Sequence, residues 1–135
     1  MMPAWIGVAL AAIALMEASK LAGQEPAPAK NPATGEATPA SSAEYDGWKV
    51  FHTLCDRCHG QDAMGSSFAP NLRASVGANG MTEAAFASVV GDGRTDKGMP
   101  AFKSMITEAQ FGQLYAYLKA RSAGTLGPGR PKRAS

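Results

Sequence analysis

The residues of this chain that could do chemistry lie together in the run Cys55-Asp56-Arg57-Cys58-His59. This C-x-x-C-H spacing is the attachment pattern of a c-type haem, in which two thiols add to the vinyl groups of the porphyrin and the histidine ligates the iron. The sequence contains 2 cysteines, both in this run, so no thiol remains for a disulfide framework. We therefore predict that Cys55 and Cys58 bind one covalent haem c and that His59 is its proximal iron ligand.

Two other kinds of site also use a C-x-x-C pair. A thioredoxin-like redox site lies next to a βαβ pattern, and this chain has no alternating β-branched run. A structural zinc ion needs four ligands, usually in two separated pairs. Here the available ligands, His52, Cys55, Cys58 and His59, are all close together in the sequence. Haem attachment is therefore favoured over both alternatives.

The sixth iron position has candidate ligands in Met64, Met81, Met99, Met105 and His52. His52 and Met64 lie close to His59 in the sequence and cannot easily reach the opposite face of a haem. Met99 lies in the run Gly98-Met99-Pro100, where glycine lets the backbone approach closely and proline stiffens the turn. We predict Met99 as the sixth ligand.

Three helices are predicted to position these residues. Apolar residues recur at helical spacing over residues 45–58 and lead directly into the haem motif. A second helix is predicted over 82–91, with Thr82 as its N-cap and Gly91 as its end. A third is predicted over 107–124, where Thr107 and Gln110 form a capping-box pattern. The fold class is all-α, and a large apolar haem would supply the core that so small a domain lacks.

The ends of the 135-residue chain differ in composition from the predicted domain at 44–122. Residues 1–22 contain an apolar stretch of the length of a signal-peptide core, with an uncleaved membrane anchor as the alternative. Residues 23–43 are rich in proline and alanine and predict a flexible linker. Residues 123–135 form a basic tail rich in glycine and proline, for which a disordered extension is the alternative. We expect export to the periplasm.

Charge excludes one class of partner. Acidic and basic residues are equal in number within 44–122, and no basic stripe with interleaved aromatic residues is present. This is not the distribution of a nucleic-acid-binding protein.

The motifs resemble those of class I cytochromes c. Gly47, with the apolar residues of the last predicted helix, matches the family's crossing of an N-terminal and a C-terminal helix at a glycine. Ala69-Pro70-Asn71-Leu72 resembles the segment whose proline carbonyl accepts a hydrogen bond from the proximal histidine, a bond that fixes the ring. The resemblance implies a small class I cytochrome c fold, with three or more helices wrapped around one covalent haem, and an electron carrier rather than an enzyme.

A narrower resemblance lies in residues 117–131, which end in Gly127-Pro128-Gly129-Arg130-Pro131. They resemble the tail of cytochrome c-L-like proteins, which accept electrons from quinoprotein alcohol dehydrogenases. The resemblance implies such an enzyme as donor and a terminal oxidase or another cytochrome as acceptor. The alternative function is a haem gas sensor or haem enzyme, in which Met99 is labile or absent from the iron. No distal histidine or acid–base pair supports catalysis, so the carrier is favoured.

Overall fold

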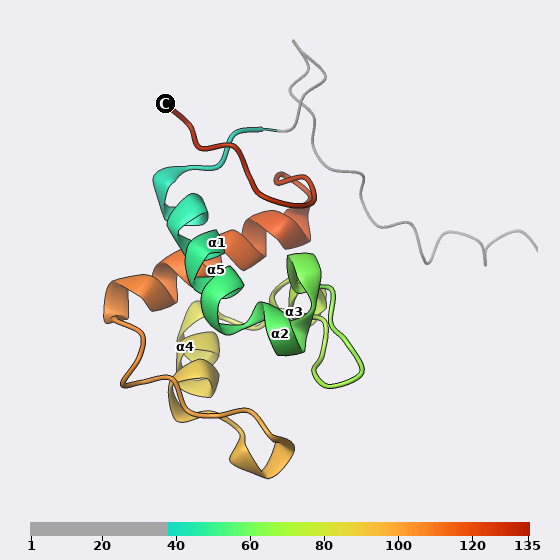
Figure 1. Cartoon of the computed structure of the whole chain (residues 1–135), viewed down its shortest axis with the longest axis vertical. Coiled ribbons are helices and arrows are strands. Elements are labelled where there is room, and N and C mark those ends of the chain that lie inside the picture. Colours follow the sequence, from blue (N-terminus) through green and yellow to red (C-terminus); the bar gives the residue numbers. More distant parts are fainter. Residues whose placement is uncertain (1–37) are drawn as a thin grey trace, which may run out of the picture.

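Two long helices cross each other and form the frame of the molecule (Figure 1). In this computed structural model, which describes residues 38–135, α1 spans Ser42–Leu54 and α5 spans Glu108–Ala123. At the crossing, a Cβ atom added to Gly47 would lie 2.0 Å from the carbonyl oxygen of Gln113. Only glycine lets the two helix backbones approach this closely.

Shorter elements connect the two helices and carry the haem motif. Among residues 38–135 they are α2 (Asp56–His59), η1 (Gln61–Ala63), α3 (Leu72–Val76), α4 (Glu83–Asp92) and η2 (Thr95–Lys97). The described residues form helices, turns and isolated β-bridges, and none of them forms a β-strand. The all-α prediction is confirmed, and α3 is a helix that the sequence patterns did not predict.

Helix boundaries follow their capping residues. α1 begins at Ser42 rather than near Glu44, because the Ser41 hydroxyl accepts the Glu44 amide at 3.2 Å and the Glu44 carboxylate accepts the Ser41 amide at 2.7 Å. α1 also ends before the haem motif, where Cys55 at φ −115° separates it from α2. The helical pattern over 45–58 is therefore divided at Cys55 between α1 and α2.

The last two helices end at glycines with a positive φ angle. α4 continues past the predicted stop at Gly91 and ends at Asp92, because the residue in the left-handed region is Gly93, at φ +73°. α5 has the predicted capping box of Thr107 and Gln110, and Gly124 at φ +73° is its C-cap.

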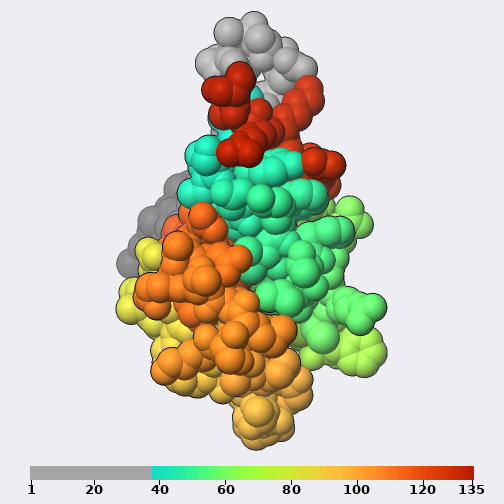
Figure 2. Space-filling model, turned by 60° about the vertical axis from the view of Figure 1, so that its left-hand side comes forward, coloured from blue at the N-terminus to red at the C-terminus, as the bar shows by residue number. Residues whose placement is uncertain are grey.

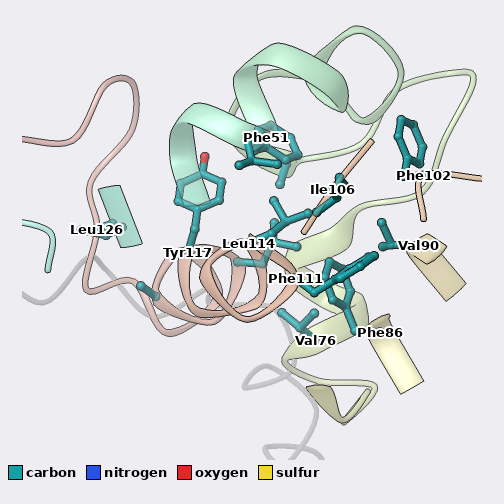
Figure 3. Close-up of a cluster of buried hydrophobic side chains, with 14 of the residues drawn as sticks. Phe51, Val76, Phe86, Val90, Phe102, Ile106, Phe111, Leu114, Tyr117 and Leu126 are labelled. Carbon is teal, nitrogen blue, oxygen red and sulfur yellow. The ribbon is translucent and has the colours of Figure 1, made fainter. Parts of the chain in front are cut away.

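The core lies where α1, α4 and α5 meet. Phe51 from α1, Phe86 from α4 and Leu114 from α5 belong to one buried cluster (Figure 3). The rings of Phe51 and Tyr117 lie with their centroids 5.4 Å apart, in a tilted arrangement that aromatic pairs favour. This packing fixes α1 against α5, and so fixes the residue from which the haem motif continues.

The C-terminal residues fold back onto α1. We call residues 124–133 the C-terminal strap; it lies beside the start of α1 (Figures 1 and 2). Leu126 is buried, and the Ala40 amide donates to the carbonyl of Lys132 at 2.7 Å. The strap is therefore packed against the domain, in contrast to the alternative of a disordered extension.

The predicted signal peptide or anchor (1–22) lies outside the described residues, as does the linker up to residue 37. None of the helices in residues 38–135 combines the length and the apolar character that a membrane span requires.

Candidate haem site

His59 is a buried histidine with one ring nitrogen held by the backbone. Its side chain comes from the end of α2, and the residue is 7% exposed. Nδ1 lies 3.0 Å from the carbonyl oxygen of Pro70. Because a carbonyl can only accept, Nδ1 carries the proton and donates it, which leaves the lone pair on Nε2. Nε2 has no hydrogen-bond partner among the described residues. The ring is thus prepared to ligate a metal through Nε2.

The loop after α2 brings Pro70 back to His59. The Gly65 amide donates to the His59 carbonyl at 2.7 Å, and the Ser66 hydroxyl donates to the Cys58 carbonyl. Gly60 at φ +72° begins the return, and a Cβ atom there would lie 2.3 Å from the carbonyl oxygen of Gly65. Glycine at position 60 therefore permits the close turn that places Pro70 beside the histidine ring.

The two cysteines are free thiols with different exposure. Cys55 is half-buried and packs against the core, whereas Cys58 is exposed. Burial raises the pKa of the Cys55 thiol to about 12, with Asp56 and Cys58 adding to the rise. A neutral thiol is a weak nucleophile. In the folded domain the Cys55 thiol is therefore held in its neutral, less nucleophilic form.

Met99 lies in a tight turn that holds its backbone on both sides. The Arg94 amide donates to the Met99 carbonyl at 2.8 Å, and the Met99 amide donates to the Arg94 carbonyl at 3.0 Å. η2 closes this turn, and Gly98 adopts the left-handed conformation that it needs. The Met99 side chain is half-buried and packs against the core. The turn presents one thioether from a fixed backbone position.

The other candidates for the sixth position differ in their surroundings. His52 is exposed, and its Nδ1 lies 2.9 Å from a carboxylate oxygen of Asp56. The Met64 sulfur accepts a hydrogen bond from Arg73 at 2.7 Å. Met105 is 58% exposed. His52 and Met64 thus each have another partner, whereas Met81, like Met99, is half-buried and packs against the core. The ligand role of Met99 stays a prediction.

The described residues fit a covalent haem. Two free thiols precede a buried histidine whose Nε2 lacks a partner, and large apolar side chains remain exposed at Met64, Phe68 and Met105. An apolar porphyrin would cover surface of this kind. Cys55 and Cys58 would hold the haem, and His59 would ligate its iron. When bound, the haem supplies a one-electron iron couple.

Sequence patterns did not reveal a buried ion pair behind the haem motif. Arg121 of α5 lies 3.1 Å from Asp62 of η1, and only 2% of the Arg121 side chain is exposed. The two residues are far apart in the sequence, and neither belongs to a recognisable motif. The available signal in the sequence was an arginine at the end of a mainly apolar helix face. A charge on such a face is buried when the helix packs, and then it needs a partner.

Comparison with known proteins identifies the family. Residues 42–118, more than half of the chain, match the family model described as cytochrome c oxidase, cbb3-type, subunit III. Cytochrome c-555 of Methylococcus capsulatus is 36% identical over 93 residues, which cover 67% of this chain and 72% of that protein. The chain belongs to this family of c-type cytochromes. The predicted covalent haem c is the cofactor of this family, and the domain is an electron-transfer domain rather than an enzyme.

Further similarities include longer proteins. The crystal structure of the c-type cytochrome XoxG from Methylobacterium extorquens AM1 is 33% identical with a TM-score of 0.61, covering 68% of this chain and 58% of that one. This likeness confirms the class I cytochrome fold. Cytochrome c-553I of Paracoccus denitrificans is 34% identical over 66% of this cytochrome, which spans 42% of that protein. Quinohemoprotein alcohol dehydrogenase ADH-IIG of Pseudomonas putida is 32% identical over 73% of this chain, which spans 14% of the enzyme.

Proposed function

We propose that this cytochrome is a periplasmic single-haem electron carrier. In this proposal it accepts electrons from a quinoprotein alcohol dehydrogenase and passes them to a terminal oxidase or another cytochrome. The observation that carries the proposal is the His59 ring held by the Pro70 carbonyl, together with the Met99 backbone held by its turn. If His59 and Met99 both ligated the iron, no coordination position would be open to a substrate.

In this proposal, the residues of the chain would keep the same ligands on the iron in its oxidised and reduced states. The Pro70 carbonyl keeps the proton of His59 on Nδ1 and raises the basicity of Nε2. As an iron ligand, the thioether of Met99 would favour the reduced state and raise the reduction potential, as suits an acceptor. An electron can then enter and leave without a proton transfer or a bond change at these side chains.

The alternative function, a gas sensor or haem enzyme, requires an open or labile sixth position. The sequence contains 2 histidines. His59 is hydrogen-bonded to the Pro70 carbonyl, and His52 is paired with Asp56 on the surface. A distal histidine that could stabilise bound oxygen or peroxide is therefore lacking, and the carrier is favoured.

One relative and the tail resemblance support an alcohol dehydrogenase as the donor. A quinohemoprotein alcohol dehydrogenase contains a segment similar to most of this chain. Its name includes both a quinone and a haem, so a domain of this kind occurs in the same polypeptide as a quinone enzyme. The tail resemblance at 117–131 agrees with that donor. Periplasmic location is supported by the apolar segment in 1–22, which has the length of a signal-peptide core.

Stopped-flow reduction tests the donor. The exported haem-loaded cytochrome is mixed with a purified quinoprotein alcohol dehydrogenase and its alcohol, and the appearance of the ferrous spectrum is recorded at increasing salt. We expect reduction to be faster than by an unrelated nicotinamide-dependent dehydrogenase at every salt concentration. Equal rates with the two enzymes would contradict the donor while leaving the carrier function intact. Rapid carbon monoxide binding by the ferrous protein near neutral pH would instead favour the sensor or enzyme.

A further inference from the structure

Arg121 is a buried cation that depends on one carboxylate. Its Nη2 lies 3.1 Å from Oδ1 of Asp62, and its Nε donates to the Tyr117 hydroxyl at 3.2 Å. Nη1 is buried without a hydrogen-bond partner among the described residues. Burial raises the pKa of Tyr117, so that hydroxyl is neutral and cannot balance the charge. Because an unpaired buried guanidinium costs free energy of folding, the Asp62 carboxylate must stay beside Arg121 in the folded protein.

The same carboxylate also holds the C-terminal strap. The Gly129 amide donates to both oxygens of Asp62, at 2.9 and 3.1 Å, and the Arg121 Nη2 donates to the Gly129 carbonyl. Further along the strap, Arg130 donates to the Tyr45 hydroxyl at 2.6 Å and lies 5.4 Å from the ring centroid of Trp48. Asp62 thus joins the strap, α5 and the turn after the haem motif.

That turn has a backbone that its surroundings must hold in place. Asp62 has φ +57° and Ala63 has φ +62°, although neither is glycine. Such residues are uncommon in the left-handed region and persist where other contacts fix them. The Ala63 amide donates to the Gly60 carbonyl at 3.2 Å, and Gly60 follows His59 directly. A change at Asp62 would therefore be transmitted to the backbone that carries the histidine.

We propose that the C-terminal strap, acting through Asp62, positions the proximal ligand of this cytochrome. The contacts of Asp62 with Arg121 and Gly129 hold the turn at 60–63, and this turn holds the His59 ring on the Pro70 carbonyl. Asp62 is a positioning residue and does not touch the iron. The inference rests on the proposed role of His59 as the proximal ligand. It assigns to the strap a function inside the domain, in addition to any contact with a donor.

The test measures how often the His59–Pro70 hydrogen bond opens. In the ferrous, haem-loaded protein, NMR follows the exchange of the Nδ1 proton of His59 with solvent. The variants are Asp62→Asn, a chain that ends at Gly124, and both changes combined. Asp92→Asn is the matched control, because it removes the same charge at an exposed position at the end of α4, where the carboxylate accepts from Ser88 and does not touch the strap. Leu126→Ala loosens the strap and leaves the pair of Asp62 and Arg121 intact, so it serves if the stronger variants do not fold.

We expect Asp62→Asn and the shortened chain each to speed this exchange by at least about tenfold, the factor expected when a charge-assisted hydrogen bond is lost. The combined variant should be little faster than either alone, because both changes break the same link. Asp92→Asn should exchange at the wild-type rate. If the strap variants melt at a lower temperature but keep the wild-type exchange rate, the strap only stabilises the fold and the proposal is wrong. A wild-type protein without covalent haem would overturn the haem assignment and, with it, this role of the strap.

Discussion

The hydrogen bond between His59 and the Pro70 carbonyl decides which nitrogen of the ring is available. A carbonyl has no proton to give, so Nδ1 must donate and Nε2 keeps its lone pair. Burial of the ring stabilises this tautomer, because a polar group without a hydrogen-bond partner costs free energy away from water. A neutral imidazole of fixed tautomer is the form that iron binds.

Covalent attachment is the first prediction at this scale. Replacing Cys55 and Cys58 together by alanine should abolish the haem that survives acid-acetone extraction, since these are the 2 cysteines of the chain. Each single replacement should leave a protein with one thioether bond. Mass spectrometry of the exported protein measures the added haem mass. A wild-type protein that folds stably without this mass would contradict the assignment.

Met99 gives the second prediction. Met99→Ala should open the sixth position, so that the ferrous protein binds carbon monoxide readily. The reduction potential should fall by on the order of 0.1 V, because axial ligands tune haem potentials over about 0.8 V. Carbon monoxide titration and redox potentiometry measure the two effects. Met81→Ala is the control, since Met81 is, like Met99, a half-buried methionine packed against the core, and its replacement should leave both properties unchanged. If carbon monoxide binding and the reduction potential of Met99→Ala equalled those of the wild type, Met99 would not be an iron ligand.

The motif residues could be predicted from the sequence because their chemistry is local. C-x-x-C-H fixes the order of thiol, thiol and imidazole within one turn of chain. Asp62 could not be found in this way. Its role depends on Arg121 and Gly129, which only the folded chain brings to it.

Helix ends were predictable where a capping side chain or a glycine marks them. Thr107 and Gly124 bound α5 as expected, whereas Gly91 did not end α4. Gly91 is buried, and a Cβ atom there would lie 3.7 Å from the Phe111 ring, so this glycine sits in the packed part of the helix. A sequence cannot distinguish a glycine that ends a helix from one that packs within it.

The crossing of α1 and α5 gives a prediction at the scale of elements. Gly47→Ala should destabilise the fold by about 2 kcal/mol or more, because its Cβ atom would lie 2.0 Å from the Gln113 carbonyl oxygen and the helices would have to separate. Thermal and denaturant unfolding of the haem-loaded protein measure the change.

Gly112→Ala is the matched control on α5. A Cβ atom at Gly112 would meet the end of the Glu83 side chain, which can move aside. Alanine inside a helix should then stabilise the fold by about 0.5–1 kcal/mol. Equal effects of the two substitutions would mean that the close approach at Gly47 is not needed.

At the scale of the whole molecule, the C-terminal strap joins elements that lie far apart in the sequence. The helices supply one apolar cluster, and the strap ties the start of α1 to the turn after the haem motif and to α5. The sequence predicted the composition of the tail, but its packing against Asp62 and Tyr45 was out of reach because it depends on tertiary contacts.

The last prediction concerns folding without haem. The protein in which Cys55 and Cys58 are both alanine should show no cooperative thermal transition and should bind a hydrophobic dye, as expanded states do. The reason is that Met64, Phe68 and Met105 are 43, 83 and 58% exposed, and a domain this small has little other core to compensate. The haem-loaded wild type should melt cooperatively, because a group that binds only the folded state stabilises it. Circular dichroism and calorimetry on the two proteins measure the difference. A haem-free protein that melts cooperatively within a few degrees of the wild type would mean that the helices fold by themselves, and that the haem adds chemistry without adding core.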